Sequence, residues 1–224
     1  MSLLSCVEVP PRTVASDARA PASIVWLHGL GASGHDFEPF VPHLGVPHAR
    51  FVFPHAPPRA VTINAGYVMP AWYDIHSLDF EGDEREDEAD ILACTQQIEA
   101  LLAREEARGV PASRIVLAGF SQGAAMALHV AHRYPERLAG VMILSGYLVR
   151  PDALGEGHPA NEDTPMLFHH GRFDDVVPPF AGRAAYEVFE RPDRDVRWKE
   201  YPMAHEVSEE QVEDIARWLR ERIG

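Results

Sequence analysis

The stretch Ile-Val-Leu-Ala-Gly-Phe-Ser-Gln-Gly, residues 115–123, joins an apolar run to a turn bounded by two glycines. The run at 115–118 is continuously apolar, as expected of a strand buried on both faces of a parallel sheet. A helical pattern of small residues follows at 124–133 and ends before Pro135. The stretch therefore predicts a strand, a sharp turn and a helix, with Ser121 at the turn.

Comparable apolar runs recur in both directions from this stretch, and each is followed closely by glycine or proline. They occupy residues 24–27, 50–53, 141–144, 166–169 and 196–198. Helical patterns lie between or after them at 84–108, at 182–191 and from Ser208 to Ile223, where Ser208 and Gln211 fit a capping box. The alternation predicts an α/β fold with a mostly parallel central sheet and helices on both faces.

Length, charge and cysteine content narrow the classes of protein. The 224 residues predict one domain, 1–224, with no insertion long enough for a separate lid. A net charge of −14 argues against nucleic acid or an anionic membrane as partner, since both require Lys and Arg to neutralise them. No leader or apolar run of about 18 residues is visible, and two cysteines make no disulfide framework. We expect a cytoplasmic protein without stable membrane association.

Ser121 becomes a nucleophile only if a base accepts its proton and an acid orients that base. In a strand–turn–helix of this kind the acid and then the histidine should follow in the chain. Asp174 and Asp175 follow the run at 166–169, and His205 follows the run at 196–198. The order predicts a Ser–Asp–His triad and leaves the choice between the two aspartates open. For the serine motif alone, the alternative is a capping serine in a glycine-rich turn.

Acyl transfer also requires backbone donors for the oxyanion of the tetrahedral intermediate. The amide of Gln122, which follows the serine, supplies one. The loop after the strand at 24–27 contains Gly29 and Gly31, which let its backbone turn inward and make the N–H of Leu30 the second candidate. A plain strand-to-helix turn is the alternative interpretation of that loop.

Several segments taken together resemble one family. They are residues 28–36, 53–57, 69–75 and 118–123 and the surroundings of Asp174 and His205, spread over nearly the whole chain. This set resembles the carboxylesterase and acyl-protein thioesterase (lysophospholipase-like) family of α/β-hydrolases. The resemblance implies the α/β-hydrolase fold, Ser121 as nucleophile, His205 as general base and Asp174 rather than Asp175 as the orienting acid. It also implies the amides of Leu30 and Gln122 as the oxyanion hole.

The segment from Val61 to Ile75 contains Met69, Trp72 and Tyr73 without a helical period. We interpret it as an ordered excursion beside the site, with Met69 and Trp72 as substrate contacts and core packing as the alternative. Because no lid is predicted, we expect a shallow, open cleft with an apolar groove for the acyl group.

These observations predict a serine carboxylesterase that cleaves small to medium-chain esters or thioesters through an acyl-enzyme. We expect no cofactor, and no metal site because the histidines form no ligand cluster. The acidic run from Glu81 to Asp90 is interpreted as a solvated helix N-terminus. The alternatives are an acyl-protein thioesterase or lysophospholipase with long-chain substrates, and a non-catalytic hydrolase-fold binding protein. The sequence leaves open whether the protein forms a homodimer.

Overall fold

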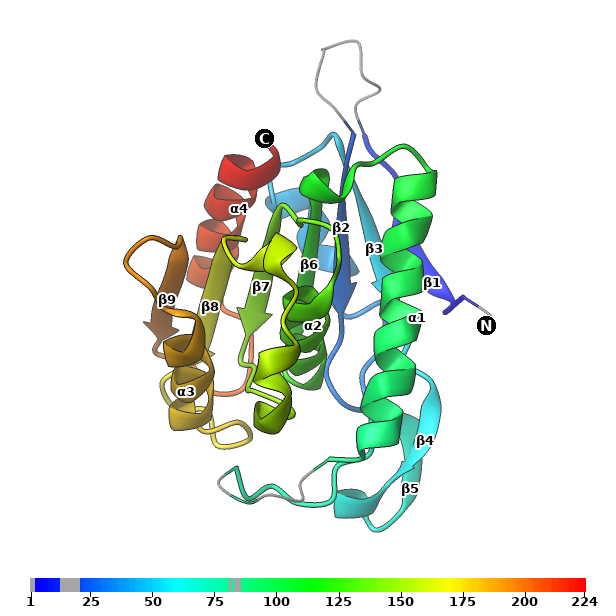
Figure 1. Cartoon of the computed structure of the whole chain (residues 1–224), viewed down its shortest axis with the longest axis vertical. Coiled ribbons are helices and arrows are strands. Elements are labelled where there is room, and N and C mark those ends of the chain that lie inside the picture. The colour runs from blue at the N-terminus through cyan, green and yellow to red at the C-terminus, as the bar shows by residue number, and fades with distance from the viewer. Residues whose placement is uncertain (1–2, 13–20, 81, 83–85) are drawn as a thin grey trace.

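A seven-stranded sheet forms the centre of the molecule (Figure 1), in the order β1-β3-β2-β6-β7-β8-β9. The computed structural model describes residues 3–12, 21–80, 82 and 86–224. Strand β1 pairs antiparallel with β3, and all other pairs in this sheet are parallel. The strands are β1 (Cys6–Val9), β2 (Ala22–Leu27), β3 (Ala49–Pro54), β6 (Ile115–Phe120), β7 (Gly140–Leu144), β8 (Met166–Gly171) and β9 (Val196–Tyr201).

The six predicted strands are confirmed, each one to three residues longer than its apolar run. Strand β1 was not predicted. It has four half-buried residues at the sheet edge, where Val7 pairs with Phe53, so its pattern is too short and too weakly apolar to stand out.

Helices cover both faces of the sheet, as predicted. They are α1 (Glu88–Ala107), α2 (Gln122–Arg133), α3 (Pro179–Phe189) and α4 (Glu209–Ile223). Figure 1 shows α1, α2 and α3 in front of the sheet and α4 behind it. The side chains of one strand alternate accordingly: Val25 and Leu27 pack in the core under the first group, and Ile24 and Trp26 pack in the core with α4.

The helix ends differ from the predicted ones for local reasons. Helix α1 begins at Glu88 because Asp87 caps it by accepting the N–H of Asp90 at 2.9 Å. The predicted start at Glu84 lies outside the described residues. Asp90 also accepts the backbone N–H of Asp74, so the end of the acidic run is not simply solvated. Ser208 caps α4 through the N–H of Gln211, but the side chain of Gln211 makes no return bond within the described part of the chain.

Short 3-10 helices and one hairpin complete the chain. The 3-10 helices are η1 (Glu38–His43), η2 (Thr62–Asn64), η3 (Ala112–Arg114), η4 (Pro151–Glu156) and η5 (Pro159–Asn161). Strands β4 (Pro58–Val61) and β5 (Tyr67–Pro70) form a separate antiparallel hairpin, which lies near the carboxyl edge of the sheet in Figure 1. The predicted excursion, Val61 to Ile75, is thus ordered; it begins at the last residue of β4 and includes β5.

The described residues include no separate lid domain over the carboxyl edge of the sheet. None of the described helices combines the length and the apolar character that crossing a bilayer requires.

Candidate active site

Ser121 occupies the sharp turn between β6 and α2. Its backbone has φ 55° and ψ −123°, a conformation that residues with a side chain rarely adopt. The serine precedes the first residue of α2, yet its side chain accepts no capping hydrogen bond from that helix. The hydroxyl is therefore not used as a helix cap, which disfavours the capping interpretation.

Both glycines of the turn are required by close backbone approach. A Cβ atom on Gly119 would lie 2.2 Å from the carbonyl oxygen of Gly123. A Cβ atom on Gly123 would lie 2.4 Å from the carbonyl oxygen of His28, at the end of the neighbouring strand β2. Glycine at 119 therefore lets the turn close on itself, and glycine at 123 lets it pack against the end of β2.

The loop after β8 brings Asp174 to His205. Oδ2 of Asp174 lies 2.7 Å from Nδ1 of His205, and Oδ1 accepts the backbone N–H groups of Val176 and Val177 at 3.0 and 2.8 Å. Burial disfavours the charged carboxylate, but the hydrogen bonds from His205 and Val177 outweigh it and hold the pKa of Asp174 below its ordinary value. Asp174 is thus an ionised acceptor at neutral pH.

The geometry distinguishes the two candidate aspartates. The side chain of Asp174 is 0% exposed and contacts His205, whereas Asp175 is exposed. Because an ionised carboxylate only accepts, Nδ1 of His205 carries the proton and Nε2 keeps a free lone pair. This is the tautomer that a general base for a serine hydroxyl requires.

Ser121 and His205 line one cavity of about 400 Å³ at the carboxyl edge of the sheet. Its walls are mostly apolar, and Asp36 and Glu206 add two carboxylates. The lining residues are Gly29, Leu30, Ala32, Asp36, Phe37, Phe40, Phe120, Ser121, Val176, His205, Glu206 and Val207. The cavity therefore combines a hydroxyl, an imidazole and an apolar surface.

The loop after β2 lies directly against Ser121. A Cβ atom on Gly29 would lie 3.4 Å from Cβ of Ser121. The buried ring of His28 orients this loop: Nε2 accepts the N–H of Ala56 at 3.0 Å, so Nδ1 is the donor to the carbonyl of Gly29 at 2.7 Å. Burial lowers the pKa of His28, which keeps the ring neutral. The carbonyl of Gly29 and the N–H of Leu30 belong to the same trans peptide group and point in opposite directions. Because the carbonyl faces the ring of His28, the N–H of Leu30 points away from that ring.

Trp72 lies in the core and not in the cavity. It is 0% exposed, and its indole N–H donates to the carbonyl of His28 at 2.8 Å. This burial contradicts the predicted substrate contact and supports the core-packing alternative for this residue. Met69 is half-buried above the loop after β2, with its sulfur 3.5 Å from the position of a Cβ atom on Gly31.

The sequence did not single out several residues of the cavity wall. Val176 and Val207 are each two positions from a triad candidate, a spacing that could have identified them. Phe37 and Phe40 come from the start of η1 and carried no signal, because aromatic residues there are equally compatible with the core.

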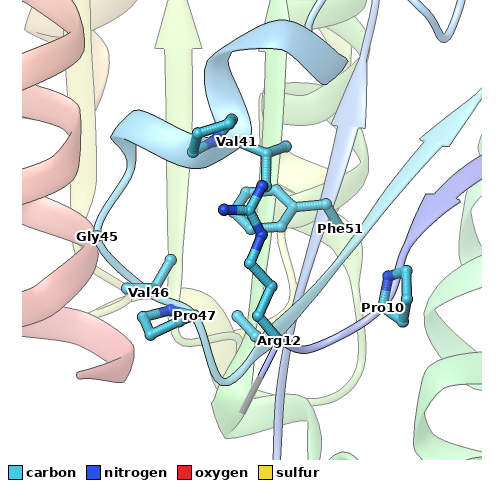
Figure 2. Close-up of a pocket in the computed structure, with 9 residues that line it drawn as sticks. Pro10, Arg12, Val41, Gly45, Val46, Pro47 and Phe51 are labelled. Carbon is cyan, nitrogen blue, oxygen red and sulfur yellow. The ribbon is translucent and has the colours of Figure 1, made fainter.

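A second cavity, of about 200 Å³, lies away from this site beside the first residues of β3. Figure 2 shows the side chain of Arg12 extending into it, among Val41, Val46 and Phe51. None of the three triad candidates lines it. Within the described ranges, no three His, Cys, Asp or Glu side chains are grouped as metal ligands.

Comparison with known proteins gives consistent matches over most of the chain. A family model described as phospholipase/carboxylesterase matches residues 10–223. A probable carboxylesterase of Oryza sativa subsp. japonica is 34% identical over 220 residues, which cover 96% of this chain and 83% of the relative. Acyl-protein thioesterase 1 of Yarrowia lipolytica is 34% identical over 222 residues, covering 96% of this chain and 97% of the relative.

Solved structures of similar fold include two plant proteins. The crystal structure of Arabidopsis thaliana SOBER1 superposes with a TM-score of 0.85 at 30% identity, covering 92% of this chain and 100% of that one. The Zea mays acyl-protein thioesterase 2 superposes with a TM-score of 0.83 at 28% identity, covering 98% of this chain and 99% of that one.

Proposed function

The chain belongs to the phospholipase/carboxylesterase family of α/β-hydrolases, and from this premise we propose that Ser121, His205 and Asp174 cleave small to medium-chain esters or thioesters. The enzyme is a hydrolase of carboxylic-ester bonds. The observation that carries the assignment of residues is the 2.7 Å contact between Asp174 and His205, with His205 sharing one cavity with Ser121.

The proposed reaction runs in two halves. Nε2 of His205 takes the proton of Ser121 as Oγ attacks the carbonyl carbon, and the backbone N–H groups of Leu30 and Gln122 bind the resulting oxyanion. The tetrahedral intermediate then collapses: the bond to the leaving group breaks, the protonated imidazole gives its proton to the leaving alkoxide or thiolate, and the acyl group stays on Oγ. A water molecule, deprotonated by His205, attacks the acyl-enzyme; the acid leaves and Ser121 regains its proton.

The size and lining of the cavity support the substrate class. About 400 Å³ is at the small end of the range for small-molecule sites, about 300–1,000 Å³. Phe37, Phe40 and Phe120 supply apolar walls for an acyl chain. Asp36 and Glu206 make an anionic substrate unfavourable there. Neutral esters and thioesters with short to medium acyl chains fit these walls best.

A third cavity, with mostly apolar walls, favours the long-chain alternative. It has about 260 Å³ and is lined by Phe80, Tyr147, Leu148, Pro151, Phe180, Ala181 and Ala184. Tyr147 follows β7 and Phe180 lies in the first turn of α3, so this cavity also opens near the carboxyl edge of the sheet. An acyl chain too long for the first cavity would need this additional apolar surface, as in an acyl-protein thioesterase or lysophospholipase.

The test combines one substitution with a series of acyl lengths. Wild-type enzyme should hydrolyse aryl esters, with kcat/KM highest at short to medium chains, and Ser121→Ala should lower kcat by about 10⁴-fold or more. Ser145→Ala is the matched control, because Ser145 also has a positive φ, 49°, and its buried hydroxyl has no partner among the described residues. A maximum at long chains would favour the alternative substrate class.

Labelling by a fluorophosphonate separates the enzyme from a silent binding protein. Wild-type and Ser145→Ala protein should be labelled and Ser121→Ala should not. An unlabelled wild-type protein would contradict the catalytic assignment. We further propose that residues 1–224 act as one hydrolase domain in the cytoplasm.

A further inference from the structure

We propose that Trp72 is a positioning residue of the oxyanion hole, because it joins the two backbone segments that carry the donors Leu30 and Gln122. This inference rests on the proposed function. It gives Trp72 a role in catalysis without contact to substrate, different from the contact that its sequence position suggested.

Trp72 holds both segments through buried hydrogen bonds. Its indole N–H donates to the carbonyl of His28 at 2.8 Å, two residues before Leu30. Its backbone N–H donates to Oε1 of Gln122 at 2.9 Å. The other end of the same carboxamide donates from Nε2 to the carbonyl of Tyr73 at 2.7 Å. Trp72, His28 and Gln122 are each no more than 1% exposed, so water cannot replace these bonds without a rearrangement.

The sheet alone does not set the distance between the two donors. Strands β2 and β6 pair in register up to Leu27 and Gly119, and both donors lie beyond that last pair. After β2 the chain continues into the loop that contains Leu30, and after β6 it continues through Ser121 into α2. The two segments touch directly where Gly123 packs against the carbonyl of His28. Trp72 adds a second link between them from a third segment, through its side chain and its own backbone.

The third segment is itself anchored, which makes it a rigid support. The carbonyl of Trp72 accepts the thiol of Cys94 on α1 at 2.6 Å. The carbonyl of Ala71 accepts a hydrogen bond from Nε–H of Arg59 at 2.9 Å. The carbonyl of Pro70 accepts the N–H of Gly31 at 2.8 Å, beside Leu30. Residues 70–72 are therefore hydrogen-bonded to α1, to the hairpin and to the loop that contains Leu30, and they hold these three parts at fixed positions relative to one another.

Small displacements of oxyanion donors have large kinetic effects. Donors act at about 2.7–3.1 Å from the oxyanion, and a shift of about 1 Å can cost about 100-fold in rate. Loss of the indole hydrogen bond leaves the buried carbonyl of His28 without this donor and removes one of the bonds that position the loop. We expect the loss to appear in transition-state stabilisation and not in binding of the uncharged substrate.

Trp218 provides a matched control for the substitution. It is 1% exposed, and its indole nitrogen has no hydrogen-bond partner among the described residues. It packs on α4 against Gly140, at the amino end of β7 and away from the cavity. Changing either tryptophan to phenylalanine removes the same atoms from the core, but only Trp72→Phe removes a hydrogen bond to the loop.

The experiment compares Trp72→Phe and Trp218→Phe with the wild type. It measures kcat and KM for a short aryl ester, Ki for a trifluoromethyl ketone that forms a tetrahedral oxyanion with the serine, and the Tm. In Trp72→Phe we expect kcat to fall about 10- to 100-fold and Ki to rise by a similar factor, with KM within about threefold. In Trp218→Phe we expect kcat and Ki to stay within about threefold, even if the Tm falls.

A second variant covers the case in which Trp72→Phe does not fold. Gln122→Met removes the carboxamide but keeps the backbone N–H, and it should show the same joint change in kcat and Ki. Unchanged kcat and Ki in a folded Trp72→Phe, or equal losses in Trp218→Phe, would overturn the positioning role. Failure of the proposed function itself would appear in a different experiment, as turnover that survives Ser121→Ala in otherwise wild-type enzyme.

Discussion

Asp174 contacts His205 through one carboxylate oxygen and binds its own loop through the other. Oδ2 faces Nδ1 of His205 at 2.7 Å, and Oδ1 accepts the N–H groups of Val176 and Val177. Nε2 of His170 lies 3.6 Å from Oδ2 of the same carboxylate and 2.8 Å from the carbonyl oxygen of Val177. The carboxylate of Asp174 is therefore held on both sides, and its hydrogen bond to Nδ1 decides the tautomer of His205.

Replacing Asp174 should abolish most of the activity, whereas replacing its neighbour Asp175 should not. In Asp174→Asn the carboxamide can donate to Nδ1 and so favours the wrong tautomer of His205, and we expect kcat to fall about 10⁴-fold. Asp175→Asn, at an exposed position one residue further, should keep kcat within about threefold. Steady-state kinetics on a short aryl ester checks both. Equal losses in the two variants would contradict the assignment.

The carboxylates of the cavity should select against anionic esters. Asp36 and Glu206 line the site, and both are exposed, so their effect is screened by salt. At low ionic strength we expect an aryl ester with an anionic acyl group to have kcat/KM about 3- to 10-fold below a neutral one of equal size. The ratio of kcat/KM for the neutral ester to kcat/KM for the anionic ester should become smaller in Glu206→Gln, and added salt should also make it smaller.

Glu209→Gln is the control for this charge effect. Glu209 lies at the first residue of α4 and is not part of the cavity wall. It changes the net charge by the same amount as Glu206→Gln, so a general change of net charge would affect both variants alike. A ratio that is insensitive to Glu206→Gln and to salt would show that the cavity does not discriminate by charge.

Gly123→Ala should destabilise the protein because the added methyl group has no space. Its Cβ would meet the carbonyl oxygens of His28 and Leu27 at 2.4 and 2.5 Å, both rigid backbone atoms. We expect a loss of about 1–3 kcal/mol in the free energy of unfolding, as for overpacked cores. Gly155→Ala, whose Cβ would meet nothing within 4 Å, should change it by less than about 0.5 kcal/mol. Urea unfolding of both variants provides the measurement.

His129 should make the fold sensitive to acid. Burial, with neighbouring Arg133 and Arg150, lowers the pKa of this histidine from 6.5 to about 3, and neither ring nitrogen has a partner among the described residues. Between these two pKa values the unfolded chain binds a proton that the folded chain does not. The free energy of unfolding therefore falls as the pH falls from about 6.5 to about 3, by up to about 1.4 kcal/mol per pH unit.

The substitution His129→Leu removes this group and should flatten that dependence. Urea unfolding at pH 7 and at pH 4.5 measures the difference for the wild type and for the variant. The loss of stability between the two conditions should be smaller in the variant. An identical loss in both proteins would show that His129 does not contribute to acid sensitivity.

The sequence determined the order of elements and placed the candidate site residues at the ends of strands. Continuous apolar runs and helical periods are local patterns, and they place β2, β3, β6, β7, β8 and β9 and the four α-helices within a few residues. The triad candidates were recognisable because Ser121, Asp174 and His205 follow three of those strands, and parallel strands end at one edge. Resemblance to the family added the choice of Asp174 and the assignment of Leu30 and Gln122.

Only the tertiary structure decided which side chains meet. Asp174 and Asp175 are chemically identical neighbours, and burial against His205 separates them. Trp72 has a residue type suited to binding a substrate or to packing a core, and its partners, His28 and Gln122, lie 44 and 50 residues away along the chain. The aromatic walls at Phe37 and Phe40 depend on how η1 packs. Such contacts depend on the packing of distant segments, which local sequence patterns do not encode.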